Sequence, residues 1–227
     1  MIIGGLVKNS FVDYPHKISC VVFTTGCNFR CWYCHNSHLF VAKNKIDEEK
    51  LFEFLSSHKK FLDGVVVSGG EPTLQKDLVQ FISRIKAMGF LCKLDTNGTD
   101  FETLKFLVDN KLVDYVAMDI KSPFEDYSQI VGDIAKNLME NVKKSAKYLL
   151  ENHVDYEFRT TLSPDITYEQ LDRLCREIAG AKCYSIQKYR QVVQNSKNMA
   201  EQGRAFHQKA MEIAKKYIKD VQLKGVD

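Results

Sequence analysis

The stretch Gly26-Cys27-Asn28-Phe29-Arg30-Cys31-Trp32-Tyr33-Cys34-His35-Asn36 places three thiols within eight positions. Cysteines separated by three and then two residues in a loop can direct their sulfurs inward, onto neighbouring corners of a cubane iron-sulfur cluster. Three protein ligands leave the fourth iron open, whereas a cluster that only carries electrons normally has four thiolate ligands. The stretch therefore predicts a four-iron cluster that takes part in chemistry.

Three other kinds of site fit parts of this stretch. Zinc could be held by the three cysteines together with His35 or His38. Covalent haem fits the C-x-x-C-H pattern from Cys31 to His35, although such haem belongs to exported proteins. A redox dithiol at Cys31 and Cys34 would leave Cys27 without a role. The spacing favours the cluster over these alternatives.

The composition is that of a soluble protein of 227 residues with a formal net charge of +3. This length predicts one domain over residues 1–227, with a core at about 18–190, an N-terminal segment 1–17 and a C-terminal helix and strand within 199–227. The lysines cluster at helical spacing, which is typical of a solvated helix face, so we expect no nucleic-acid binding. The sequence has no signal peptide and no long apolar run, so we expect a cytoplasmic protein that does not bind membranes.

Seven cysteines, an odd number, argue against a disulfide framework in such a compartment. Cys20, Cys92, Cys175 and Cys183 lie in or beside apolar runs or on a helix face. We expect these four residues to be small buried hydrophobic groups.

Runs with strand character alternate with helical patterns along the chain. The expected strands are 18–24, 64–67, 90–94, 115–118, 156–161 and 182–189, with a last short strand at 221–224. The expected helices begin at the acidic residues 47–49, cover 74–89, begin at a capping box of Thr99 and Glu102, cover about 137–152, begin at a second capping box of Thr167 and Gln170, and cover about 199–218. Six strand-helix units predict an α/β fold, an open partial (β/α)6 barrel with a parallel sheet.

Polar residues and glycines follow these strands where each strand ends. In parallel strand-helix folds the chemistry gathers at the carboxyl ends of the strands, so these groups should line one mouth of the barrel. They are the cysteine loop, Ser68-Gly69-Gly70-Glu71, Asp95-Thr96-Asn97, Asp119-Ile120-Lys121, Arg159 and Arg190.

The three-cysteine motif and the glycine turn after the second strand resemble the radical-SAM superfamily. Tyr33, Cys34-His35-Asn36, Asp95-Thr96-Asn97-Gly98 and Asp119-Ile120-Lys121 resemble its glycyl-radical-enzyme activases. The opening Gly4-Gly5-Leu6 to Asp13-Tyr14-Pro15 is most similar to the activating proteins of anaerobic ribonucleoside-triphosphate reductase. The superfamily resemblance covers about residues 18–190.

The resemblance implies a [4Fe-4S] cluster on Cys27, Cys31 and Cys34 whose open iron binds S-adenosylmethionine through its amine and carboxylate. Electron transfer to the sulfonium then gives a 5′-deoxyadenosyl radical, which abstracts hydrogen from a glycine of the partner enzyme. The implied cofactor contacts are Tyr33, Cys34 and His35 along the adenine, Gly69, Gly70 and Glu71 in the turn, and Arg159 at the carboxylate. Asp95, Thr96 and Asp119 are implied to hold a monovalent cation beside the cofactor. The neighbouring Ile120 and Lys121 are further implied contacts. Arg190 lies where pyruvate formate-lyase activases have a histidine.

The implied partners are a glycyl radical enzyme, the anaerobic reductase, and flavodoxin or ferredoxin as electron donor, since the chain lacks the ferredoxin-like insert of some activases. Activation of another glycyl radical enzyme such as pyruvate formate-lyase is the alternative within this group. A radical-SAM enzyme acting on a small metabolite is a second alternative. A zinc-stabilised binding module without catalysis is a third, from a different class.

Overall fold

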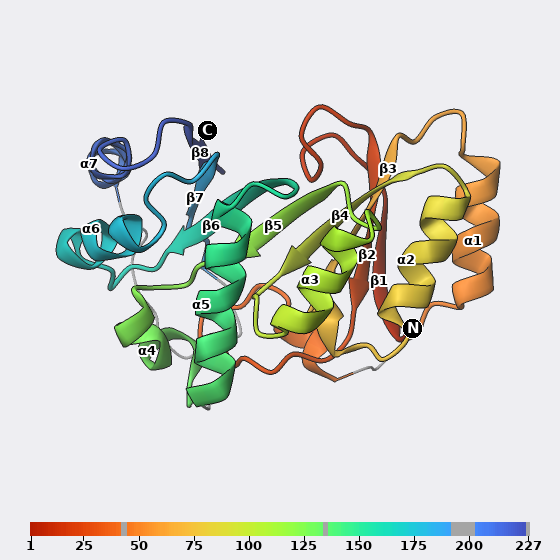
Figure 1. The fold of residues 1–227 in the computed structure, drawn as a ribbon, viewed down its shortest axis with the longest axis horizontal. Helices are drawn as coiled ribbons and strands as arrows, with labels where there is room; N and C mark the ends of the chain where they lie inside the picture. The colour runs from red at the N-terminus through yellow and green to blue at the C-terminus, as the bar shows by residue number, and fades with distance from the viewer. Residues whose placement is uncertain (42–44, 134–135, 192–202, 226–227) are drawn as a thin grey trace.

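A computed structural model describes residues 1–41, 45–133, 136–191 and 203–225 (Figure 1). The strands form one sheet in chain order: β1 (Ile3–Ser10), β2 (Ser19–Thr24), β3 (Gly64–Gly69), β4 (Leu91–Thr96), β5 (Tyr115–Asp119), β6 (Asp155–Leu162), β7 (Tyr184–Lys188) and β8 (Val221–Lys224). The pairs from β2 to β8 are parallel, and β1 pairs antiparallel with β2. Among the described residues β1 and β8 are unpaired with each other, which leaves the barrel open and confirms the expected fold class.

The helices follow the sheet in chain order, from α1 and α2 near β1–β3 to α6 and α7 near β7 and β8 (Figure 1). Their bounds are α1 (Glu48–Ser57), α2 (Leu78–Ala87), α3 (Phe101–Asp109), α4 (Tyr127–Val131), α5 (Lys136–Leu150), α6 (Tyr168–Glu177) and α7 (Arg204–Ala214), with 3-10 turns η1 (Ser37–Phe40), η2 (Pro72–Leu74) and η3 (Phe124–Asp126). Within the described ranges, none of these helices has the length and apolar character needed to cross a membrane.

Two helix starts follow the sequence prediction. The Asp47 carboxylate accepts the amide N–H of Glu49 (2.9 Å) and so caps α1. Thr167 and Gln170 form both bonds of a capping box before α6. Each such cap supplies a partner to amides that the helix itself leaves unpaired.

Three parts of the prediction need correction. The strand β1 was not expected, because Gly4 and Gly5 within it have low strand propensity. The predicted capping box of Thr99 and Glu102 is wrong. Asp100, which is one residue nearer the helix than Thr99, caps α3, and its carboxylate accepts the amide N–H of Thr103 (3.1 Å). The last expected helix ends sooner, at Ala214, and its predicted start at 199–202 lies outside the described residues.

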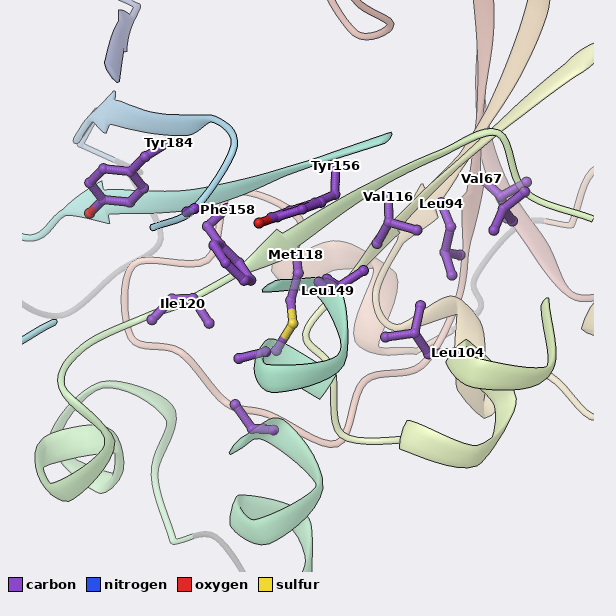
Figure 2. Close-up of a cluster of buried hydrophobic side chains, with 14 of the residues drawn as sticks. Val67, Leu94, Leu104, Val116, Met118, Ile120, Leu149, Tyr156, Phe158 and Tyr184 are labelled. Atoms are coloured by element: carbon purple, nitrogen blue, oxygen red, sulfur yellow. The ribbon is translucent and has the colours of Figure 1, made fainter. Parts of the chain in front are cut away.

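Alternate residues of each strand face the helices and form the main core. Figure 2 shows Val67 of β3, Leu94 of β4, and Val116 and Met118 of β5, with Leu104 of α3 and Leu149 of α5. Each of these side chains is fully buried, which stabilises the fold by roughly 1.5–3 kcal/mol per large apolar side chain. Cys20, Cys92, Cys175 and Cys183 are also buried, as expected.

The opposite face of the sheet is concave and has a different character. Near β2 and β3 it is covered by a small apolar cluster of Tyr14, Val21 and Val66. From β4 onward the residues on this face include Lys93, Glu157 and other charged groups, because they alternate with the apolar residues of the helix-facing core. The concave face therefore provides a polar interior beside the strand ends.

Candidate active site

A cavity of about 280 Å³ lies at the carboxyl ends of the parallel strands. Its wall includes residues that the sequence analysis selected from five separate segments: Cys27, Cys31, Tyr33, Cys34, His35, Gly69, Gly70, Glu71, Asp95, Thr96, Asp119, Lys121 and Arg159. The fold thus brings these residues together at the carboxyl ends of the strands, as predicted.

The cysteine loop is held in place by backbone hydrogen bonds to other segments. The amide of Gly26 donates to the carbonyl of Leu39 (2.8 Å), and that of Arg30 donates to the carbonyl of Val131 at the end of α4 (2.9 Å). The amide of Trp32 donates to the carbonyl of Ile130. These bonds fix the loop before any cofactor binds.

The three thiols of this loop are free and half-buried. Burial raises the pKa of Cys27 and of Cys31 to about 11, although the Lys121 ammonium acts in the opposite direction on both thiols. Binding of a metal cluster must therefore expel protons from the thiols. The Cys27 sulfur already accepts the amide N–H of Phe29 (3.4 Å), which is the kind of hydrogen bond that stabilises a cluster thiolate.

The donor set of this cavity, three thiols, suits a cluster. Within the described ranges, no three His, Cys, Asp or Glu side chains are placed to hold one metal ion. A cubane differs because each thiolate binds a different iron. In addition, the hydroxyl of Tyr33 is buried beside the cavity without a hydrogen-bond partner in the part of the chain that the structure describes.

The glycine turn packs directly against the strand that leads into the cysteine loop. A Cβ on Gly70 would lie 2.0 Å from the carbonyl oxygen of Gly26. Gly69 has a φ of +124°, and a Cβ there would lie 2.3 Å from the backbone nitrogen of Thr24. Only glycine fits at either position, so the turn and the loop form one unit.

Glu71 joins this turn to the end of β4. Its buried carboxylate accepts hydrogen bonds from the Thr73 hydroxyl (2.6 Å), the Thr96 hydroxyl (2.7 Å) and the Asn97 amide (2.7 Å). Burial raises the pKa of Glu71 even though these bonds favour the charged form. Both carboxylate oxygens of Glu71 accept hydrogen bonds, so Glu71 and Thr96 hold the glycine turn and the end of β4 together in the cavity wall.

Arg159 lies between the two aspartates at the strand ends. Its Nη1 donates to Asp95 Oδ2 (3.0 Å), and its Nε donates to Asp119 Oδ1 (2.8 Å). Burial would raise the pKa of both aspartates, but Arg159 together with Lys93 at Asp95 and with Lys121 at Asp119 outweighs it, so both pKa values lie below their usual range. A side chain therefore supplies positive charge between these carboxylates, and the monovalent cation expected at Asp95, Thr96 and Asp119 stays a prediction.

Lys121 connects this group to the cysteines. Its ammonium donates to Asp119 Oδ2 (2.7 Å) and is the positive charge that acts on Cys27, Cys31 and Cys34. Burial would lower the pKa of Lys121, but Asp119 and then Cys31 raise it well above its usual value. The residue is thus a permanent cation facing the cluster loop.

Two predicted contacts do not reach the cavity. Ile120 is fully buried in the helix-facing core, as Figure 2 shows, because it alternates with Asp119 on β5 and the turn that follows. Arg190 is exposed and is absent from the cavity wall. Its charge acts at longer range, since burial and then Arg190 lower the pKa of His35.

Several functional residues of the concave face were not predicted from the sequence. Lys93 and Glu157 are buried there, and their signal was visible as charged residues two positions before Asp95 and Arg159 in otherwise apolar strands. Other members of the cavity wall that were not predicted are Asp13, Phe23, Thr161 and Gln187.

The chain was compared with known proteins. The model of the family described as "Radical SAM superfamily" matches residues 21–178. A protein of Methanocaldococcus jannaschii named "Putative glycyl-radical enzyme activating enzyme MJ1227" is 38% identical over 196 residues, which is 83% of this chain and 80% of that protein. The pyruvate formate-lyase-activating enzyme of Streptococcus mutans serotype c is 34% identical over 183 residues, 73% of this chain and 68% of the relative.

Solved structures share the fold at lower identity. The crystal structure of Streptococcus suis SuiB bound to precursor peptide SuiA superposes with a TM-score of 0.73 at 17% sequence identity. The match covers 90% of this chain and 48% of SuiB, so the chain spans about half the length of that structure.

Proposed function

Because the chain belongs to the radical SAM superfamily, and within it to the glycyl-radical enzyme activating enzymes, we propose that it generates the glycyl radical of an anaerobic (class III) ribonucleoside-triphosphate reductase. The family supplies the cofactors, S-adenosylmethionine and a [4Fe-4S] cluster. The observation that carries the proposal is the cavity in which three free thiols lie beside charged strand ends on the open side of a partial barrel.

The cysteine loop would hold the cluster through Cys27, Cys31 and Cys34. When bound, the cluster and S-adenosylmethionine supply a low-potential electron and a hydrogen-abstracting adenosyl radical. The protein's contribution is a loop that hydrogen bonds fix in advance and a buried ammonium, that of Lys121, beside the thiolates.

The charged strand ends would orient the methionine part of the cofactor. Lys121 has Asp119 as its hydrogen-bonded acceptor among the described residues, which leaves N–H groups free to bind the cofactor carboxylate. Arg159 is already shared by two aspartates, so its part is to keep them in place beside the cofactor amine. Tyr33 and His35 would lie along the adenine, and Gly69 and Gly70 would let the backbone approach the amine.

The open barrel suits a protein substrate. A glycine in a folded enzyme can reach the cavity only if its loop enters from outside, and β1 and β8 leave an unclosed side among the described residues. The SuiB structure, which shares this fold, holds a peptide, so the fold can admit one. A small metabolite would need closer enclosure by the protein's own loops.

The reductase is proposed as the target because the opening residues Gly4 to Pro15 resemble its activating proteins. Pyruvate formate-lyase is the second candidate, and the 34% identity to the Streptococcus mutans activase supports it. We propose flavodoxin or ferredoxin as the electron donor, since the described chain carries no second group of cysteines that could hold another cluster.

The test is electron paramagnetic resonance of each candidate partner after anaerobic incubation with the reconstituted protein, S-adenosylmethionine and reduced flavodoxin. We expect a glycyl radical doublet on the reductase and none on pyruvate formate-lyase. A doublet on the lyase alone would transfer the proposal to the second candidate, and its absence from both would reject glycyl radical activation of either enzyme.

A further inference from the structure

Seven charged side chains of alternating sign run along the concave face of the sheet. We call them the charge row; in order they are Lys224, Glu157, Lys93, Asp95, Arg159, Asp119 and Lys121. Neighbours in the row are separated by 2.6 to 3.8 Å between charged atoms. The row connects the candidate active-site cavity, lined by Asp95 and Lys121, with a second cavity of about 450 Å³, lined by Glu157 and Lys224.

Lys93 is the third member of this row and is almost completely buried, with 1% of its surface exposed. Its ammonium donates to Asp95 Oδ1 (2.8 Å) and lies 3.8 Å from Glu157 Oε1. The other oxygen of Asp95 accepts from Arg159 and from the Ser68 hydroxyl (3.0 Å each). Lys93 therefore occupies the one side of the Asp95 carboxylate that Arg159 leaves free.

Burying a charged side chain costs free energy unless the charge is paired, and the partners of Lys93 are Asp95 and Glu157. If the ammonium were removed, Asp95 and Glu157 would face the same space as two buried carboxylates. Buried carboxylates that share a site either take up a proton or bind a cation. Protonation would weaken the ion pair between Asp95 and Arg159, and Arg159 would no longer hold Asp119 in the same place. A bound cation would instead replace the charge of the ammonium and keep the ion pair.

We propose that Lys93 is a positioning residue whose ammonium serves as a built-in cation for the active site, so that cofactor binding requires no metal cation at Asp95 and Asp119. Lys93 fixes Asp95, Asp95 fixes Arg159, and Arg159 fixes Asp119 beside Lys121. This inference rests on the proposed function only in taking S-adenosylmethionine as the cofactor, and it is independent of the partner enzyme.

The experiment measures the dissociation constant of S-adenosylmethionine for the cluster-loaded protein by equilibrium dialysis, in potassium, sodium, ammonium or tetramethylammonium chloride. We expect the wild type to bind equally well in all four salts. Lys93→Met keeps the length of the side chain but not the charge, so affinity should fall by about tenfold or more in every salt. Lys93→Arg keeps the charge and should retain more affinity than Lys93→Met.

Lys93→Ala gives the most specific outcome because it leaves room for a cation between Asp95 and Glu157. Its affinity should be low in tetramethylammonium and should recover in potassium or ammonium, ions that can enter through the second cavity. In the double variant Lys93→Ala/Glu157→Gln one carboxylate is gone, and recovery by cations should be much smaller. A purely structural role for Lys93 would not produce this selectivity among salts.

The matched control is Lys86→Met, which removes a lysine that makes an equally close ion pair with Asp114 away from the charge row. It should bind the cofactor as the wild type does. Iron content and thermal unfolding of every variant show whether the cluster and the fold survive.

A wild type that binds S-adenosylmethionine only in sodium or potassium would overturn the proposal, and this arm needs no variant. Unchanged affinity of Lys93→Ala in tetramethylammonium would overturn it as well. Because no partner enzyme is present in the assay, a wrong assignment of the target leaves these results unaffected.

Discussion

The amide of Glu71 donates a 2.8 Å hydrogen bond to the carbonyl of Gly26, so the glycine turn after β3 is joined to the residue before the first cysteine. A Cβ on Gly70 would collide with that same carbonyl group. The turn therefore shapes the cysteine loop as well as any cofactor bound beside it.

Replacement of Gly70 should consequently affect the cluster as well as the cofactor. Gly70→Val must push the loop away from β3, at a cost of roughly 1–3 kcal/mol for the overpacking, and should lower both iron content and S-adenosylmethionine affinity. Gly203→Ala is the control, because a Cβ at Gly203 meets no atom of the described residues within 4 Å. Full iron content in a folded Gly70→Val variant, measured by iron and sulfide analysis, would show that the loop is independent of the turn.

The seven cysteines should separate into two classes. Alanine at Cys27, Cys31 or Cys34 should each prevent a stable four-iron cluster, because only these thiols line the cavity. Alanine at Cys20, Cys92, Cys175 or Cys183 should leave iron content unchanged and cost about 1 kcal/mol of stability through the lost packing. Retention of the cluster after loss of Cys31 would reject the assignment of ligands.

Arg159→Met should be among the most destabilising substitutions on the concave face. It removes the guanidinium that Asp95 and Asp119 share and leaves each carboxylate with one lysine, so the loss should reach at most roughly 3–5 kcal/mol, which chemical denaturation can measure. Lys105→Met removes an exposed ion pair with Asp109 and should cost less than about 1 kcal/mol. If the two substitutions had equal effects, the aspartates would have to be solvated or protonated.

Glu177 gives the fold a pH dependence that can be assigned to one residue. Burial raises the pKa of this carboxyl to about 7 from its ordinary value of 4.5, although the amide of Phe124 donates to it. Because the folded state retains the proton more strongly, the stabilising effect is complete below pH 4.5 and is lost as the pH rises to 7. The free energy of unfolding should therefore decrease over this range.

Glu177→Gln removes the titration and keeps an oxygen that can accept the Phe124 amide. Relative to the wild type, the variant should gain stability from about pH 4.5 to about pH 7, and the difference should then level off. A difference between the two proteins that stays constant over this range would show that Glu177 titrates normally.

The fold could be predicted from the sequence where the hydrophobic periodicity of a segment and its capping or turn residues indicate the same element. Alternating strands and helices gave the open barrel, and Thr167 with Gln170 gave the start of α6. The strand β1 was not predicted because its stability comes from pairing with β2, a tertiary interaction that the local composition does not reveal.

The residues that line the site could be predicted from the sequence, but the ion pairs between them could not. Strand ends correctly placed Asp95, Asp119 and Arg159 in one cavity. That Arg159 bridges the two aspartates depends on the register of β4, β5 and β6, which no single segment encodes. Ile120 was chosen for its neighbours, but its side chain faces the core because successive residues of a strand point to opposite faces.

The most direct test of the central claim is the transfer of deuterium from the partner to 5′-deoxyadenosine. The partner reductase would carry α-deuterated glycine in its C-terminal glycine loop, and the reaction would contain the cluster-loaded protein, reductant and S-adenosylmethionine. The account predicts that mass spectrometry detects deuterium in 5′-deoxyadenosine, and that a peptide copied from the loop also donates deuterium and accelerates cofactor cleavage. Absence of transfer from both the reductase and the peptide, together with transfer from a deuterated small metabolite, would contradict it.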